Sequence, residues 1–176
     1  DPGALVLPCG APPSAFDRAG GGRAGRGNGD GGHAGTGDPD RIFVGLTNGQ
    51  AIAFSAGNGA VLWTRKVGGQ PLVLTLNRDR VFVGASDDFL YALAADSGKQ
   101  KWRWRTGGDV GGPVAADGTR VYFASLDNSL VALGRGGGDM KWEQRLPSRP
   151  VGGPVLVGDT VILVTVASEL KTFAAG

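Results

Sequence analysis

The chain has 176 residues and a formal net charge of +2, with 33 glycines, 10 prolines and a single cysteine. This length favours one domain with at most a tail attached, and the small net charge argues against nucleic-acid binding. A single cysteine excludes an intramolecular disulfide and a CxxC-type metal or redox site, and no apolar run is long enough for a membrane-spanning helix.

The N-terminal segment, residues 1–40, differs in composition from the rest of the chain. Positions 10–39 are rich in glycine and carry few apolar side chains. Such a segment cannot offset its ordering entropy by burial, so we predict a flexible tether or an inserted loop. The only histidine, His33, lies in this segment, which argues against a Ser-His-Asp site with a rigid base.

Cys9 precedes the glycine-rich segment, in an arrangement that resembles bacterial lipoproteins anchored through an N-terminal cysteine. Lipidation of Cys9 is therefore one interpretation. The preceding residue is Pro8, however, where lipobox sequences need a small residue. An unmodified thiol is the default interpretation.

From residue 41 to residue 176 the sequence repeats with a period of 39 or 40 residues. Three markers share this period, and periods of this size indicate solenoids, propellers or other arrays. They are the starts of apolar runs at 41, 80, 120 and 160, the tryptophans Trp63, Trp102 and Trp142, and the glycines four residues before these, Gly59, Gly98 and Gly138.

Each repeat predicts four short strands and no helix. In the third repeat the strands cover residues 112–116, 120–125, 129–134 and 140–146. They are separated by Asp-Gly, Asp-Asn and Gly-Gly-Gly, which favour tight turns. The sequence therefore predicts an all-β chain, and a four-stranded antiparallel unit of this length is typical of a β-propeller blade.

The stretch ALAADSGKQKW, residues 92–102, resembles the A-L-D-A-x-T-G-x-x-x-W signature of the PQQ-like β-propeller repeats. The other repeats keep parts of it, and the Gly-Pro-Val elements at 112–114 and 153–155 also match the family. In this family the tryptophan docks against the neighbouring blade, near the glycine of the turn and the preceding alanine. The resemblance thus implies blade docking for the three tryptophans and three glycines above, and for Ala53, Ala92 and Ala132.

The chain holds about 3.5–4 blades, because the fourth repeat stops after its third predicted strand. The stretch GALVL, residues 3–7, has two interpretations. It is either the first strand of the first blade or the missing outer strand of the last. PQQ-like propellers usually have seven or eight blades, so we expect a partial propeller, or a half that self-associates with a second copy.

The resemblance to the family's dehydrogenases would imply a vicinal Cys-Cys pair, a stacking tryptophan and calcium held by acidic residues. This chain has no Cys-Cys pair, and its acidic residues fall mostly in turns, where they suit hairpin geometry. We therefore predict no catalytic residues, no cofactor and no metal site.

The stretch KQKWRWRTG, residues 99–107, alternates basic and aromatic residues. One interpretation is a cationic docking stripe for an acidic partner or phosphate, formed by Arg103 and Arg105 with Trp104 as an exposed anchor. The other, which we favour, is an outer edge strand whose charges prevent edge-to-edge aggregation.

Taken together, the residues and the resemblance predict a non-catalytic scaffold for protein–protein interaction. Among non-enzymatic members of the family, the chain is most similar to the BamB-like branch, which supports outer-membrane protein assembly from an extracytoplasmic location. Two alternatives stay open. One is a fragment of a PQQ-dependent dehydrogenase whose ligands lie on other blades, and the other is a sensor propeller attached to a module such as a kinase.

Overall fold

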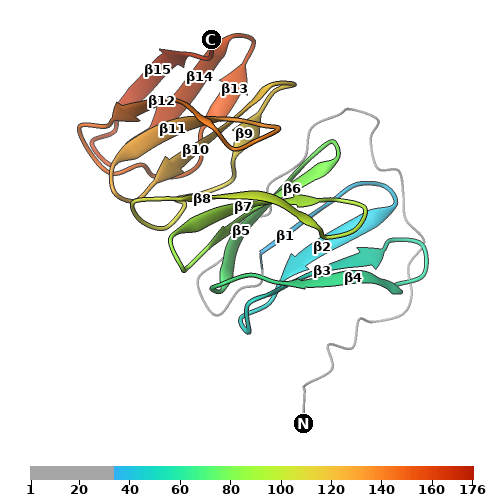
Figure 1. Cartoon of the computed structure of the whole chain (residues 1–176). Helices are drawn as coiled ribbons and strands as arrows, with labels where there is room; N and C mark the ends of the chain where they lie inside the picture. Colours follow the sequence, from blue (N-terminus) through green and yellow to red (C-terminus); the bar gives the residue numbers. More distant parts are fainter. Residues whose placement is uncertain (1–33) are drawn as a thin grey trace.

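The computed structural model describes residues 34–176, which form four antiparallel sheets without a helix (Figure 1). The first sheet contains β1 (Gly35–Gly37), β2 (Arg41–Gly45), β3 (Gln50–Ser55) and β4 (Val61–Lys66). The second contains β5 (Pro71–Asn77), β6 (Arg80–Ala85), β7 (Phe89–Ala94) and β8 (Gln100–Arg105). The third contains β9 (Ala115–Ala116), β10 (Arg120–Ser125), β11 (Ser129–Gly134) and β12 (Met140–Arg145). The fourth contains β13 (Val155–Val157), β14 (Thr160–Val164) and β15 (Leu170–Ala174).

Within each sheet the strands pair in chain order, so each repeat is an up-and-down meander. The tight turns between the second and third strands need a left-handed residue. Asp88 and Asn128 supply it in the second and third sheets, with φ of 60° and 66°. Short polar side chains tolerate this conformation better than most. The predicted all-β fold, a partial propeller of four-stranded antiparallel blades, is confirmed.

The first sheet begins earlier than the sequence predicted. Strand β1 lies inside the segment predicted as flexible, and it pairs with β2 through Thr36 opposite Phe43. Thr36 Oγ1 also accepts a hydrogen bond from Leu76 N at 3.2 Å. Backbone pairing rather than side-chain burial orders this strand, so composition did not reveal it.

Strand β1 pairs with β2 as the first strand of the first sheet. The stretch GALVL, for which two interpretations were given, lies outside the described residues, as do Cys9, His33 and most of the predicted tether.

The apolar core lies between successive sheets rather than within one of them. Strand β6 is apolar at successive positions because both of its faces are buried. Val81 and Val83 face a cluster shared with the first sheet, and Phe82 faces a cluster shared with the third. A third cluster joins the third and fourth sheets. A strand that is buried on both faces needs apolar residues at every position, which is the pattern that the repeat shows.

The first strands of the sheets lie next to one another, as Figure 1 shows for β1 and β5. Threonine side chains connect them in a repeating manner. Thr36 accepts from the β5 backbone, and Thr75 Oγ1 in turn accepts from Val114 N at 3.1 Å. These bonds fix the sheets at one end and leave the fourth strands on the outer rim.

Asp117 holds the turn between β9 and β10. Its Oδ1 accepts hydrogen bonds from the backbone N–H groups of Thr119 at 2.6 Å and Arg120 at 2.7 Å, and its Oδ2 lies 2.9 Å from the Tyr122 hydroxyl. Burial alone would raise the pKa of Asp117, but these hydrogen bonds together outweigh it and lower the pKa to about 2. The folded state therefore stabilises the charged carboxylate.

We expect Asp117→Asn to lower the free energy of unfolding by about 1 kcal/mol at neutral pH, after allowance for solvent screening. The folded pKa lies below that of the unfolded chain, about 3.9. The contribution is therefore complete above the unfolded pKa and is lost as the pH falls towards 2. Urea unfolding at several pH values measures it, with Asp159→Asn at an exposed turn as the control. A destabilisation that does not change with pH would contradict the role assigned to the charge.

Candidate functional site

Trp63 connects the first sheet to the second. Its ring lies 5.8 Å from that of Phe43, and its Nε1 donates a hydrogen bond to Ala95 O at 3.0 Å. Gly98 has a φ of +66°, and a Cβ placed on it would lie 2.6 Å from Trp63 Cε3. Glycine is therefore required at this position for two reasons. The turn needs a positive φ, and the Trp63 indole packs where a side chain would otherwise stand.

Trp102 repeats this contact between the second and third sheets. Its ring lies 5.8 Å from that of Phe82, and its Nε1 donates to Arg135 O at 3.0 Å. Gly138, with a φ of +75°, lies under the indole, and a Cβ there would be 2.7 Å from Trp102 Cδ2. The tryptophan of one repeat thus packs on the glycine of the next.

The alanines of the motif lie opposite the tryptophans of their own sheets. In the ladders, Ala53 pairs with Trp63, Ala92 with Trp102 and Ala132 with Trp142. All three alanines are fully buried. Their small side chains leave room for the indole to turn towards the neighbouring sheet.

Trp142 packs against the fourth sheet, where its ring stacks on that of Phe173 with the centroids 6.5 Å apart. Gly59 has a φ of +71°, and among residues 34–176 no atom lies within 4 Å of a Cβ placed on it. The turn of the first repeat thus has the left-handed glycine without an indole from the described residues on it.

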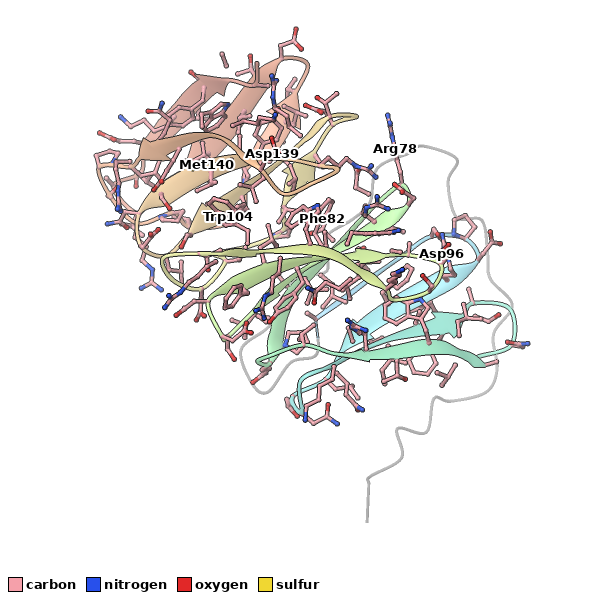
Figure 2. All side chains as sticks on the ribbon, viewed as in Figure 1. Arg78, Phe82, Asp96, Trp104, Asp139 and Met140 are labelled. Atoms are coloured by element: carbon pink, nitrogen blue, oxygen red, sulfur yellow. The ribbon has the colours of Figure 1, made fainter. Side chains whose placement is uncertain are left out.

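Trp104 is half-buried and packs against the cluster between the second and third sheets, which does not fit the interpretation of this residue as an exposed anchor. It faces the same side of β8 as Trp102, and that side meets the third sheet. Figure 2 shows Trp104 where these two sheets face each other. Arg103 and Arg105 are exposed, and the Arg103 guanidinium lies over the Phe89 ring at 4.7 Å.

A cleft of about 260 Å³ opens beside Trp104, between the second and third sheets. It combines aromatic, aliphatic, hydroxyl and charged groups. We call it the Trp104 cleft, and its lining residues are Trp104, Arg105, Thr106, Gly107, Phe123, Asp127, Ser129, Val131 and Glu143. Thr106 is only 5 % exposed, and its Oγ1 has no hydrogen-bond partner in the described part of the chain.

A second cleft, of about 410 Å³, lies near the turns that follow β5 and β7, and charged residues predominate in its lining. Its acidic group Asp79 is paired with Arg80 and Arg135. The hydrogen bond from Arg135 is the main cause that holds the pKa of Asp79 below its usual range. These charges satisfy one another, and Arg135 also donates to Asn77 O at 2.9 Å, so the cluster connects two sheets.

Residues 34–176 contain neither a cluster of metal ligands nor a membrane-spanning helix. No three histidine, cysteine, aspartate or glutamate side chains gather there as metal ligands. Nor does this region contain a helix with the length and hydropathy needed to cross a membrane.

Sequence reasoning identified Trp104 and Arg105 but missed the other residues of the cleft. Most of them come from β10, β11 and β12, which the motif analysis did not treat as a site. The signal that would have found them is a comparison of the repeats position by position. Thr106, for example, stands where the first and third repeats have Val67 and Leu146.

A family model described as outer membrane protein assembly factor BamB matches residues 14–110 and 103–176. No curated protein matches the chain. Among solved structures, BamB from Moraxella catarrhalis is similar with a TM-score of 0.69 and 23 % identity, over 77 % of this chain and 43 % of that one.

Two further structures share the fold. The computationally designed Ika4 protein is similar with a TM-score of 0.73 and 13 % identity, over 82 % of this chain and 89 % of that one. BBS1N in complex with ARL6DN is similar with a TM-score of 0.64 and 16 % identity, over 78 % of this chain and 46 % of that one. The chain thus spans less than half the length of the BamB structure that it matches.

We expect Gly98→Ala to lower the free energy of unfolding by about 2–4 kcal/mol, because the added Cβ meets the Trp63 indole as well as the left-handed backbone. Gly59→Ala is the matched control. Gly59 has a similar positive φ, but no atom of residues 34–176 lies within 4 Å of an added Cβ, so this substitution should cost only about 1 kcal/mol. Urea unfolding of the two variants separates backbone strain from packing between sheets. Equal costs would contradict the docking role of the tryptophan.

Proposed function

We propose that the chain is a non-catalytic scaffold that binds other polypeptides. The chain belongs to the PQQ-like β-propeller family described as outer membrane protein assembly factor BamB, and this membership supports the proposal. The Trp104 cleft is the observation that carries this proposal. It places a half-buried aromatic wall and charged groups on the outer rim, where two sheets meet. Aromatic residues beside charged ones are typical of the centres of protein–protein interfaces.

Strand β8 supplies a second means of binding next to the cleft. It is the outer strand of its sheet, so one side of its backbone has no neighbouring strand among residues 34–176. An extended segment of a partner would pair with this edge, while its side chains enter the cleft. The exposed Arg103 and Arg105 favour an acidic segment and oppose pairing of the edge with unrelated strands.

The family's description supports a place in outer-membrane protein assembly, and with it an extracytoplasmic location. A second copy of the chain that completes the partial propeller is a further proposed partner.

A photo-crosslinking amino acid in place of Arg105 tests the scaffold function in the cells that produce the protein. We expect covalent adducts with components of outer-membrane protein assembly, identified by mass spectrometry, because Arg105 lines the cleft and flanks the open edge. Asn58 is the matched control position. It is exposed as well, but it lies in the turn before β4, away from the cleft.

The absence of adducts at Arg105, or the same adducts at Asn58, would contradict this proposal. A separate measurement addresses the dehydrogenase alternative. In the protein isolated from the cells that produce it, pyrroloquinoline quinone with calcium should leave the midpoint of thermal unfolding unchanged, whereas a dehydrogenase that binds the cofactor in its folded state would show a higher midpoint.

A further inference from the structure

The interface between the first and second sheets is closed by a tyrosine. The Tyr91 hydroxyl donates a hydrogen bond to Asp87 Oδ2 and accepts one from Gly68 N at 3.1 Å. Burial, followed by the contact with Asp87, raises the pKa of Tyr91, so its hydroxyl stays protonated and acts as the donor. Phe89 packs beside it, with ring centroids 6.0 Å apart.

The interface between the second and third sheets has the same aspartate and glycine but no tyrosine. Asp127 and Gly107 occupy the repeat positions of Asp87 and Gly68. Their geometry is the same, because a Cβ on Gly107 would lie 1.8 Å from Asp127 Oδ2, and one on Gly68 would lie 2.0 Å from Asp87 Oδ2. Val131 stands where Tyr91 stands, so this repeat provides no hydroxyl.

The carboxylate of Asp127 is only partly engaged. Ser129, which replaces Phe89 in the repeat, donates its hydroxyl to Asp127 Oδ1 at 2.6 Å. Asp127 lines the cleft, and its Oδ2 lies 3.9 Å from Arg145 Nη1, beyond hydrogen-bond distance. An acceptor is therefore available at the position that receives the phenol at the first interface.

The buried hydroxyl of Thr106 is a second, independent observation that points to a ligand. Its position is apolar in the neighbouring repeats, where Val67 and Leu146 are buried. Thr106 is buried to the same degree, yet its Oγ1 has no partner in the described part of the chain. A buried hydroxyl without a hydrogen bond destabilises a fold, so a bound polar group would relieve this cost.

The cleft has the size of one side chain. Its volume of about 260 Å³ is below the range of pockets for drug-sized ligands and cofactors. Two aromatic side chains line the cleft at positions that are not aromatic at the first interface. Trp104 and Phe123 stand where the first interface has Arg65 and Val83. These walls offer apolar contact to a ring, and the frame of Gly107, Asp127 and Thr106 offers hydrogen bonds at its end.

We propose that the Trp104 cleft binds the tyrosine side chain of a partner polypeptide, in the manner in which Tyr91 fills the preceding interface. The ring packs against Trp104 and Phe123. The hydroxyl donates to Asp127 Oδ2 and lies within reach of Gly107 N and Thr106 Oγ1. The proposal rests on the scaffold function, for which it names the side chain that one site recognises.

N-acetyl-L-tyrosinamide is the probe that tests the site directly. In an NMR titration of the full chain, we expect saturable shifts of the Trp104 indole N–H and the Val131 methyl groups. N-acetyl-L-phenylalaninamide, which lacks the hydroxyl, should bind about tenfold more weakly. Shifts that never saturate, or equal affinity for the two probes, would overturn the proposal.

Thr106→Val is the variant that separates binding from folding, because the first repeat already has Val67 at this position. Removal of the unpartnered hydroxyl should raise the midpoint of thermal unfolding. It should also reduce the preference for the tyrosine probe over the phenylalanine probe. A variant that gains stability and keeps its preference would show that Thr106 plays no part in binding and would contradict the assigned geometry.

Val131→Tyr restores the side chain of the preceding interface. It should fill the cleft from within and abolish binding of the tyrosine probe, with a higher unfolding midpoint than Val131→Phe, which fills the space without the hydroxyl. Binding that persists in a folded Val131→Tyr protein would place the probe elsewhere and overturn the proposal.

The outcomes for this site and for the scaffold function are distinguishable. Binding of the tyrosine probe without crosslinked partners in cells would support the site and contradict the scaffold function. Partners crosslinked at Arg105 without binding of the probe would support the scaffold function and contradict the tyrosine site.

Discussion

The contact between a tryptophan and the glycine of the next repeat is the interaction on which the rest of the structure depends. The indole packs where a side chain would otherwise stand, and its Nε1 donates to a carbonyl of the same turn. A flat ring and a directed hydrogen bond together set the separation and the angle of two sheets. The apolar clusters between the sheets then fill a space whose dimensions this contact has fixed.

With the frame held in this way, the side chains at each interface are free to differ. Tyr91 closes the first interface with its hydroxyl, while Val131 leaves the second open beside Trp104. The two interfaces have the same docked tryptophan and the same aspartate–glycine pair, but a tyrosine fills the first and a cleft opens at the second. Repetition therefore maintains the fold, and departures from repetition produce candidate binding surfaces.

The sequence predicted the fold well because its markers are local and periodic. Gly98 and Trp102 lie four residues apart and recur at a fixed spacing, so one repeat suffices to recognise the others. Strand β1 could not be predicted in this way, because its order comes from backbone pairing with β2 and from the bond between Thr36 and Leu76. Basic and aromatic residues alternate along β8, and this pattern places Trp104 on the same side as Trp102. The pattern does not predict the burial of Trp104, which depends on residues of another repeat such as Phe123. The cleft escaped prediction because a valine in place of a tyrosine leaves no motif of its own.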